Sequence, residues 1–212
     1  MQKEKLIEEI SRKNFDREFF VEHVLREKGL RDEIVGLMLE HPHIMVYYHA
    51  FYVLSDASQI NPELFFVFWD KFVSLLKHSN SYRRDFGLVL LSNLASVDGQ
   101  GRFEEIFEDY YACLNDSRFM TAQCCVGATV NILRAKPHLA ERIGVLLLGF
   151  EQICDYPPKQ KALLTADVLD VLEIVYFSGV RQEEIRAFTL QALESLSPKT
   201  RRSAKVLIRR LD

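Results

Sequence analysis

The chain has 212 residues and a mass of 24.7 kDa, which is the size of one large or two small domains. Hydrophobic residues make up 48% and charged residues 27% of the sequence, and this composition excludes a disordered chain, a collagen and a predominantly membrane-embedded protein. The net charge of −3 differs from the strongly basic footprint of most nucleic-acid-binding proteins. Nine glycines and six prolines are too few for the turns of an all-β sandwich or barrel.

The N-terminal segment, residues 1–30, is expected to form capping helices. Three of its first five residues, Lys3, Glu4 and Lys5, are charged and lead into an amphipathic stretch, so we expect no signal peptide. The longest apolar runs of the chain, residues 64–69 and 145–150, fall well short of the ~20 residues that span a membrane. We therefore expect a cytoplasmic protein with no membrane partner, whose oligomeric state the sequence leaves open.

Helical periodicity extends over nearly the whole sequence. Between residues 103 and 114, apolar side chains recur at the spacing of one helix face. The segment 171–177 is rich in β-branched and aromatic residues, but it continues a helical stripe and is also expected to be helical. Short breaks divide the chain into about twelve helices. These breaks fall at residues 14–16, 29–30, 41–42, 61–62, 79–81, 98–101, 115–117, 136–137, 155–158, 178–179 and 197–198.

The breaks recur with a regular period. Alternate helices are expected to begin near Pro42, Ser81, Ser117, Pro158 and Pro198, at separations of 39, 36, 41 and 40 residues. A unit of two helices repeated at this length is typical of an α-solenoid, in which stacked pairs bury a core that one pair cannot bury alone. The sequence therefore predicts an all-α fold, with one domain over residues 1–212 and about six antiparallel helix pairs in a right-handed superhelix.

The second helix of several pairs starts with a basic residue followed three positions later by a small one. The instances are Arg84 with Gly87, Lys159 with Ala162, and Arg201 with Ala204. This pattern resembles the second helix of a HEAT repeat over residues 31–212. In such a helix the small residue lets paired helices approach closely, and the basic residue can reach the acidic turn of a neighbour. Two copies depart from the pattern: Phe119 stands in the basic position before Ala122, and the copy that starts at Pro42 has Tyr and His instead.

The resemblance implies a non-enzymatic scaffold or adaptor that binds a protein or peptide on the concave face formed by the second helices. It does not identify a subfamily. An alternative in the same family is a nucleic-acid-binding protein or an alkylpurine-DNA glycosylase, which needs stacking aromatic side chains and a carboxylate in a basic groove. Trp69 and Asp70 are the candidates for that role, but Trp69 lies in an apolar stripe and core packing is the favoured interpretation.

Residues 197–212 are expected to form a basic capping helix at the C-terminal end. Residues 181–212 contain eight Lys and Arg against four acidic residues, whereas the rest of the chain carries −7. Arg202, Lys205 and Arg209 share one face of the helix, with Arg201 close by. These four are candidate partner-binding residues, through which nucleic acid or an acidic peptide could bind. The alternative is a solvated capping helix whose cations favour its C-terminal end.

Tyr47 and Tyr48 are the other candidate partner-binding residues. With Tyr52 they would form a binding surface if they lie on the concave side, since tyrosine is common at interfaces. Packing against the core, with the hydroxyl groups reaching water, is the alternative.

No catalytic residue, cofactor or metal is predicted. The spacing of His41, His43 and His49 does not bring three imidazoles to one metal. Asp167, Asp170 and Glu173 share a helix face, but a cation would need further ligands, so we interpret them as a solvated, ion-paired face. The cysteines form no CxxC pair and lie in apolar stretches, as expected for buried thiols in a reducing compartment. They are Cys113, Cys124, Cys125 and Cys154.

Overall fold

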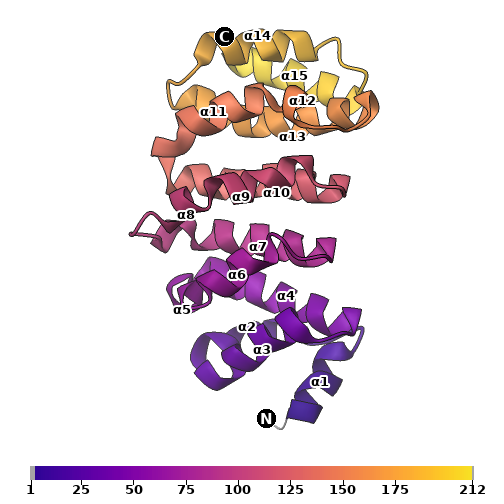
Figure 1. Cartoon of the computed structure of the whole chain (residues 1–212), viewed down its shortest axis with the longest axis vertical. Helices are drawn as coiled ribbons and strands as arrows, with labels where there is room; N and C mark the ends of the chain where they lie inside the picture. The colour runs from indigo at the N-terminus through magenta and orange to yellow at the C-terminus, as the bar shows by residue number, and fades with distance from the viewer. Residues whose placement is uncertain (1–2, 212) are drawn as a thin grey trace.

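The computed structural model describes residues 3–211, and every regular element in this range is a helix. Figure 1 shows the helices stacked in chain order along the longest axis, from α1 at one end to α14 and α15 at the other. The all-α prediction is thereby confirmed. None of the helices in the described range combines the length and the apolar character needed to cross a membrane.

Long helices form one layer of the stack, and we call them the second helices. They are α4 (Ile44–Ile60), α7 (Ser81–Leu94), α10 (Phe119–Ala135), α13 (Pro158–Phe177) and α15 (Pro198–Leu211). Each of them packs against the next one along the chain. Their first residues are 37, 38, 39 and 40 positions apart, so the predicted period of alternate helix starts is confirmed. Residues 171–177 lie within α13, as predicted.

The other layer holds the first helices, each of which precedes a second helix and packs against it or leads into it. They are α3 (Lys28–Glu40), α5 with α6 (Glu63–Phe66, Trp69–Leu75), α8 with α9 (Arg102–Glu105, Phe107–Tyr111), α11 with α12 (Ala140–Leu148, Phe150–Ile153) and α14 (Gln182–Ala192). At the N-terminal end, α1 (Lys3–Ser11) and α2 (Arg17–Arg26) pack against α4. The segment expected to cap the stack therefore lies at its end.

Three first helices are each broken by one or two residues: Val67 and Phe68, Ile106, and Gly149. Phe68, Ile106 and Gly149 share nearly the same backbone conformation, with φ/ψ of −96/7, −97/6 and −94/5 degrees. This conformation belongs to the bridge region, outside the helical region of dihedral space. None of the three is a proline, so the sequence predicts uninterrupted helices here. These breaks are the reason that the described residues form the fifteen helices α1–α15, in place of the expected twelve or so.

Small residues lie where helices approach one another closely. A Cβ atom on Gly87 would lie 3.0 Å from Leu75 Cβ and 3.0 Å from the carbonyl oxygen of Phe72. A larger residue would therefore push α7 away from α6. Ala204 is fully buried on α15. Two of the small residues of the sequence pattern thus permit close helix packing, as predicted.

One apolar core runs through most of the stack. It extends from Leu6 in α1 to Ile185 in α14, and Trp69, Phe86 and Tyr110 are among its fully buried side chains. A smaller cluster beneath α15 closes the C-terminal end. Its members are Leu169, Ala192, Ala204, Leu207 and Leu211.

Candidate partner-binding face

The solvent side of the second helices forms a strip across the stack, which we call the second-helix face. Asp85, Met120, Gln123, Asp167 and Asp170, from α7, α10 and α13, line a groove of about 560 Å³ that we call the central groove. A second groove of about 260 Å³ lies between α13 and α15 and shares Asp170 with the central groove. Because the grooves adjoin, the face is continuous from α7 to α15.

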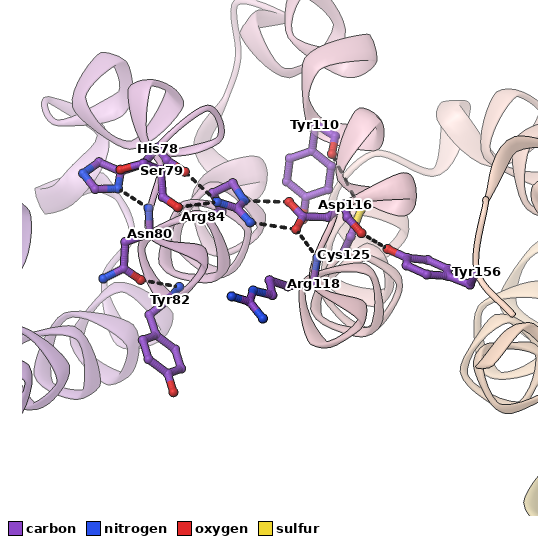
Figure 2. Close-up of polar contacts among 10 residues, drawn as sticks. All are labelled: His78, Ser79, Asn80, Tyr82, Arg84, Tyr110, Asp116, Arg118, Cys125 and Tyr156. Carbon is purple, nitrogen blue, oxygen red and sulfur yellow. Dashed lines mark hydrogen bonds and ion pairs between the residues drawn. The ribbon is translucent and has the colours of Figure 1, made fainter. Parts of the chain in front are cut away.

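A polar network ties the second helices together at their N-terminal ends (Figure 2). Arg84 of α7 pairs with Asp116, in the turn before α10: its Nε and Nη2 atoms donate to the two carboxylate oxygens at 2.6 and 2.7 Å. The two side chains are 11% and 8% exposed, so the ion pair is shielded from water. The hydrogen bonds to Asp116 raise the pKa of Arg84. Arg84 thus reaches the acidic turn of the next helix pair, as the sequence pattern predicts.

Asp116 extends this network in two further directions. Its carboxylate accepts a hydrogen bond from the N–H of Arg118 at 2.7 Å, and its main-chain carbonyl accepts one from the hydroxyl of Tyr156. Arg84 also donates to the carbonyl of His78 at 2.7 Å. Figure 2 shows Arg84 and Tyr156 reaching Asp116 from opposite sides. The network therefore fixes the starts of α7, α10 and α13 relative to one another, and with them the second-helix face.

Tyr47 and Tyr48 are neighbours on α4 but lie in different surroundings. Tyr47 is 5% exposed, and the Arg83 guanidinium lies 4.8 Å from its ring centre, so Tyr47 belongs to the core and does not form a binding surface. Tyr48 is partly exposed, and its ring centre lies 5.3 Å from those of both Tyr52 and Tyr82. Tyr52 and Tyr82 are 36% and 43% exposed. We call Tyr48, Tyr52 and Tyr82 the tyrosine cluster.

Asp85 lies where the tyrosine cluster meets the central groove. Burial, neighbouring tyrosines and Asp85 raise the pKa of Tyr48. Burial also raises the pKa of Asp85 itself, against the opposing effects of the Thr121 hydroxyl and Arg84. The Oδ1 atom of Asp85 is buried and accepts no hydrogen bond of good geometry from residues 3–211. Arg84 does not neutralise Asp85 fully, because its guanidinium is engaged by Asp116.

Asp167, Asp170 and Glu173 follow one another along α13. Lys199 pairs with Asp167 at 2.5 Å, and Arg210 pairs with Glu173 at 2.7 Å, so the predicted ion pairing is observed for two of the three. Burial, and then the charge of Asp167, raise the pKa of Asp170, which Lys199 only partly offsets. The described residues that line the central groove include three carboxylates and no Lys or Arg, so the groove is acidic. Across the described residues, no group of three or more His, Cys, Asp or Glu side chains is arranged to hold a metal ion.

The basic candidates on α15 have separate positions. Arg201 turns back and donates to the carbonyl of Ser195 at 2.6 Å, in the turn before the helix. Arg202 lines the groove between α13 and α15, and Lys205 and Arg209 are exposed. The structure does not bring these residues together with the tyrosine candidates, since α4 and α15 lie near opposite ends of the stack (Figure 1).

Trp69 and Asp70 lie on α6, in the layer of first helices. Trp69 is 1% exposed, and the guanidinium of Arg102 lies 5.6 Å from its ring centre. The same guanidinium pairs with Asp70. Trp69 therefore packs in the core, which is the interpretation that the sequence favours, and the carboxylate beside it is ion-paired.

The cysteines and histidines also have packing environments. Burial raises the pKa of Cys113 and that of Cys124 to about 12, so neither is a thiolate nucleophile at neutral pH. His49 is buried, and its ring centre lies 4.1 Å from that of Phe15. Its Nδ1 atom lies 2.6 Å from the carbonyl oxygen of Ile10. His49 therefore anchors α4 against α1.

Asp85, Met120 and Gln123, which line the central groove, do not stand out in the sequence. Their one signal is position: each lies in the first two turns of a second helix, outside the buried stripe. Comparison with known proteins adds no family to these observations: no protein-family model matches the sequence, and the curated proteins and solved structures gave no significant match.

Proposed function

We propose that this chain is a cytoplasmic, non-enzymatic scaffold or adaptor that binds a protein or peptide partner on the second-helix face. In this proposal the stack is a HEAT-like superhelix, and the second-helix face is its concave side. The helix period of 37 to 40 residues supports it. Two contacts also support it: α6 and α7 approach closely at Gly87, and Arg84 pairs with Asp116 of the next helix pair.

The observation that carries the proposal is the composition of the face. Met120 and Tyr82 are 68% and 43% exposed, and they flank carboxylates in a groove whose helices are held by a shielded ion pair. Exposed aromatic and apolar side chains on a rigid, grooved surface are typical of protein-binding sites.

The charge of the face favours a protein partner over a nucleic acid. Asp85, Asp167 and Asp170 lie at its centre, and carboxylates there repel a phosphate backbone. Nucleic-acid binding remains a second candidate function only for α15, where Lys205 and Arg209 are exposed.

A pair of matched substitutions tests the proposal. Met120 and Val67 are exposed to similar extents, 68% and 78%, but Val67 lies between α5 and α6 in the layer of first helices. Proteins captured from a cell extract by the wild-type chain are identified, purified and titrated against the wild type, Met120→Glu and Val67→Glu.

We expect Met120→Glu to weaken binding by about tenfold or more, because a charge placed at the centre of an interface acts on its energetic core. Val67→Glu should leave the affinity unchanged. If every purified partner binds Met120→Glu as tightly as the wild type, the second-helix face is not the binding site.

A further inference from the structure

The surface of α4 shows how this molecule holds a basic side chain. The guanidinium of Arg17 lies 4.9 Å from the ring centre of Tyr52 and pairs with Asp56 at 2.5 Å. The negative face of an aromatic ring attracts a cation, and a carboxylate beside it adds a charge-assisted hydrogen bond. One ring of the tyrosine cluster is thus already engaged by a guanidinium from the same chain.

The same combination of tyrosine and carboxylate recurs at α7, the next second helix along the stack. Tyr48 and Tyr82 contact each other, and Asp85 acts on Tyr48 from α7. The carboxylate of Asp85 lines the central groove, and its Oδ1 atom faces the buried hydroxyl of Thr121. A basic side chain from outside the chain, approaching between Tyr82 and Asp85, would pair with the carboxylate that Arg84 leaves only partly neutralised.

The central groove continues from this point with an apolar wall and a second carboxylate. Met120, Val130 and Val171 contribute its apolar lining, and Asp170 lies at the end shared with the groove beside α15. The charge of Asp170 is only partly offset by Lys199, which pairs with Asp167. Along the face, the order of groups is therefore aromatic and acidic, then apolar, then acidic.

We propose that the partner presents a basic, extended segment to this face. One Arg or Lys side chain lies between the tyrosine cluster and Asp85, an aliphatic side chain contacts Met120, and a second Arg or Lys side chain pairs with Asp170. This inference rests on the proposed function and specifies the chemistry of the partner. An anionic or uncharged segment would leave the carboxylates of the groove uncompensated.

The helix spacing sets the distance between the two basic residues. Asp85 and Asp170 lie on α7 and α13, with α10 between them. Packed helices are 8–10 Å apart, so the axes of α7 and α13 are about 16–20 Å apart. Asp85 is the fifth residue of α7 and Asp170 the thirteenth of α13, and the rise of 1.5 Å per residue brings the separation of the two carboxylates to about 20–23 Å. An extended chain covers this distance in about six or seven residues.

Synthetic peptides test the inference on the full chain. One set carries two arginines about six or seven residues apart, as the spacing requires, with leucine between them. Two matched sets carry glutamine or glutamate in place of both arginines. Binding is measured by fluorescence anisotropy at low and at high salt, and a single-stranded oligonucleotide is titrated in parallel.

Two double variants with the same change in net charge locate the binding site. Asp85→Asn with Asp170→Asn removes the two carboxylates of the groove, and Glu33→Gln with Glu105→Gln removes two exposed carboxylates from α3 and α8. We expect only the arginine set to bind. The groove variant should weaken it by about tenfold, and the control variant should not, because local ion pairs outweigh distant charge. Thermal unfolding confirms that both variants are folded.

Each alternative outcome is decisive. Absence of binding by the arginine set, equal weakening by both double variants, or an oligonucleotide that binds and is released by Met120→Glu would overturn the inference. If the glutamine or glutamate set binds and Met120→Glu abolishes that binding, the basic segment is wrong but the proposed function stands. The proposed function itself fails only if purified partners bind Met120→Glu normally.

Discussion

The two layers of the stack join their repeats in different ways. Between first helices, exposed ion pairs connect successive repeats. In one of them, Arg142 pairs with Glu108 at 2.6 Å, and the two side chains are 45% and 84% exposed. Between second helices, the shielded pair of Arg84 and Asp116 joins α7 to the turn before α10, and the more exposed pairs of Lys199 with Asp167 and Arg210 with Glu173 join α15 to α13. Exposed pairs contribute about 0–1 kcal/mol, whereas breaking a shielded pair leaves an uncompensated charge in a site of low polarity. The layer with the candidate binding face is thus the layer whose geometry is held most firmly.

The largest expected effect comes from breaking the shielded pair. Asp116→Ala leaves the Arg84 guanidinium without its carboxylate and the Arg118 N–H without its acceptor. We expect the free energy of unfolding to fall by about 3–5 kcal/mol. The matched variant Glu108→Ala, which removes the exposed partner of Arg142, should cost about 0–1 kcal/mol. Urea unfolding measures both, and equal losses would show that the two layers are joined alike.

Glycine substitutions are expected to have intermediate effects of opposite sign. Gly87→Ala places a Cβ atom 3.0 Å from Leu75 Cβ and from the Phe72 carbonyl oxygen, which should destabilise the fold by about 1–3 kcal/mol. Gly127→Ala on α10 meets no atom within 4 Å and should stabilise it by about 0.5–1 kcal/mol, because alanine favours the helix. Thermal denaturation of both variants gives the signs. A neutral Gly87→Ala would mean that α6 and α7 are not in close contact.

Acid should weaken a second shielded contact, at the opposite ends of the second helices. Lys136 Nζ lies 3.0 Å from Asp98 Oδ2 and 2.9 Å from Glu104 Oε2. Burial alone would raise the pKa of both carboxyls, but hydrogen bonds, including those from Lys136, outweigh it and lower both pKa values below the ordinary 3.8 and 4.5. The stability that these carboxylates contribute is therefore complete above the unfolded-state pKa values and is lost as the pH falls through the lower, folded-state values.

We accordingly expect the free energy of unfolding to decrease as the pH falls below about 4.5. In Lys136→Met the carboxyls lose their cation, so the chain is less stable at neutral pH and its stability falls less steeply in acid. Urea unfolding at a series of pH values measures the two slopes. A variant slope as steep as that of the wild type would assign the acid sensitivity to other carboxyls.

The smallest effect is expected on α15, which has a neighbouring second helix on one side only. Arg202, Lys205 and Arg209 are exposed, so their replacement by glutamate should change stability by less than about 0.5 kcal/mol per site. Retention of the triple variant on immobilised DNA and RNA should equal that of the wild type. A clear loss of retention would instead establish α15 as a nucleic-acid contact.

The second helices could be predicted from the sequence because local chemistry marks their starts. The side chain of Asn80 accepts a hydrogen bond from the N–H of Tyr82 at 3.0 Å and caps α7. Pro158 and Pro198 are the first residues of α13 and α15, where the fixed φ of proline suits a helix start. These signals act within a few residues, so the sequence is sufficient to locate them.

The breaks in the first helices and the central groove depend on contacts between distant residues. Nothing local distinguishes Ile106 from an ordinary helical residue. Tyr47 and Tyr48 are adjacent in sequence, yet the packing of α4 buries one and exposes the other. Asp85 and Asp170 are brought to one groove by the stacking of α7, α10 and α13, and no short sequence pattern records that proximity.

The repeated breaks at Phe68, Ile106 and Gly149 have a mechanical consequence. A helix interrupted at one residue bends more readily than an unbroken one, so the layer of first helices is the compliant side of the stack. The layer of second helices resists stretching, because Asp116 links the starts of α7, α10 and α13. Under load we expect the stack to bend, so that its curvature changes while the spacing of the side chains along the second-helix face is preserved.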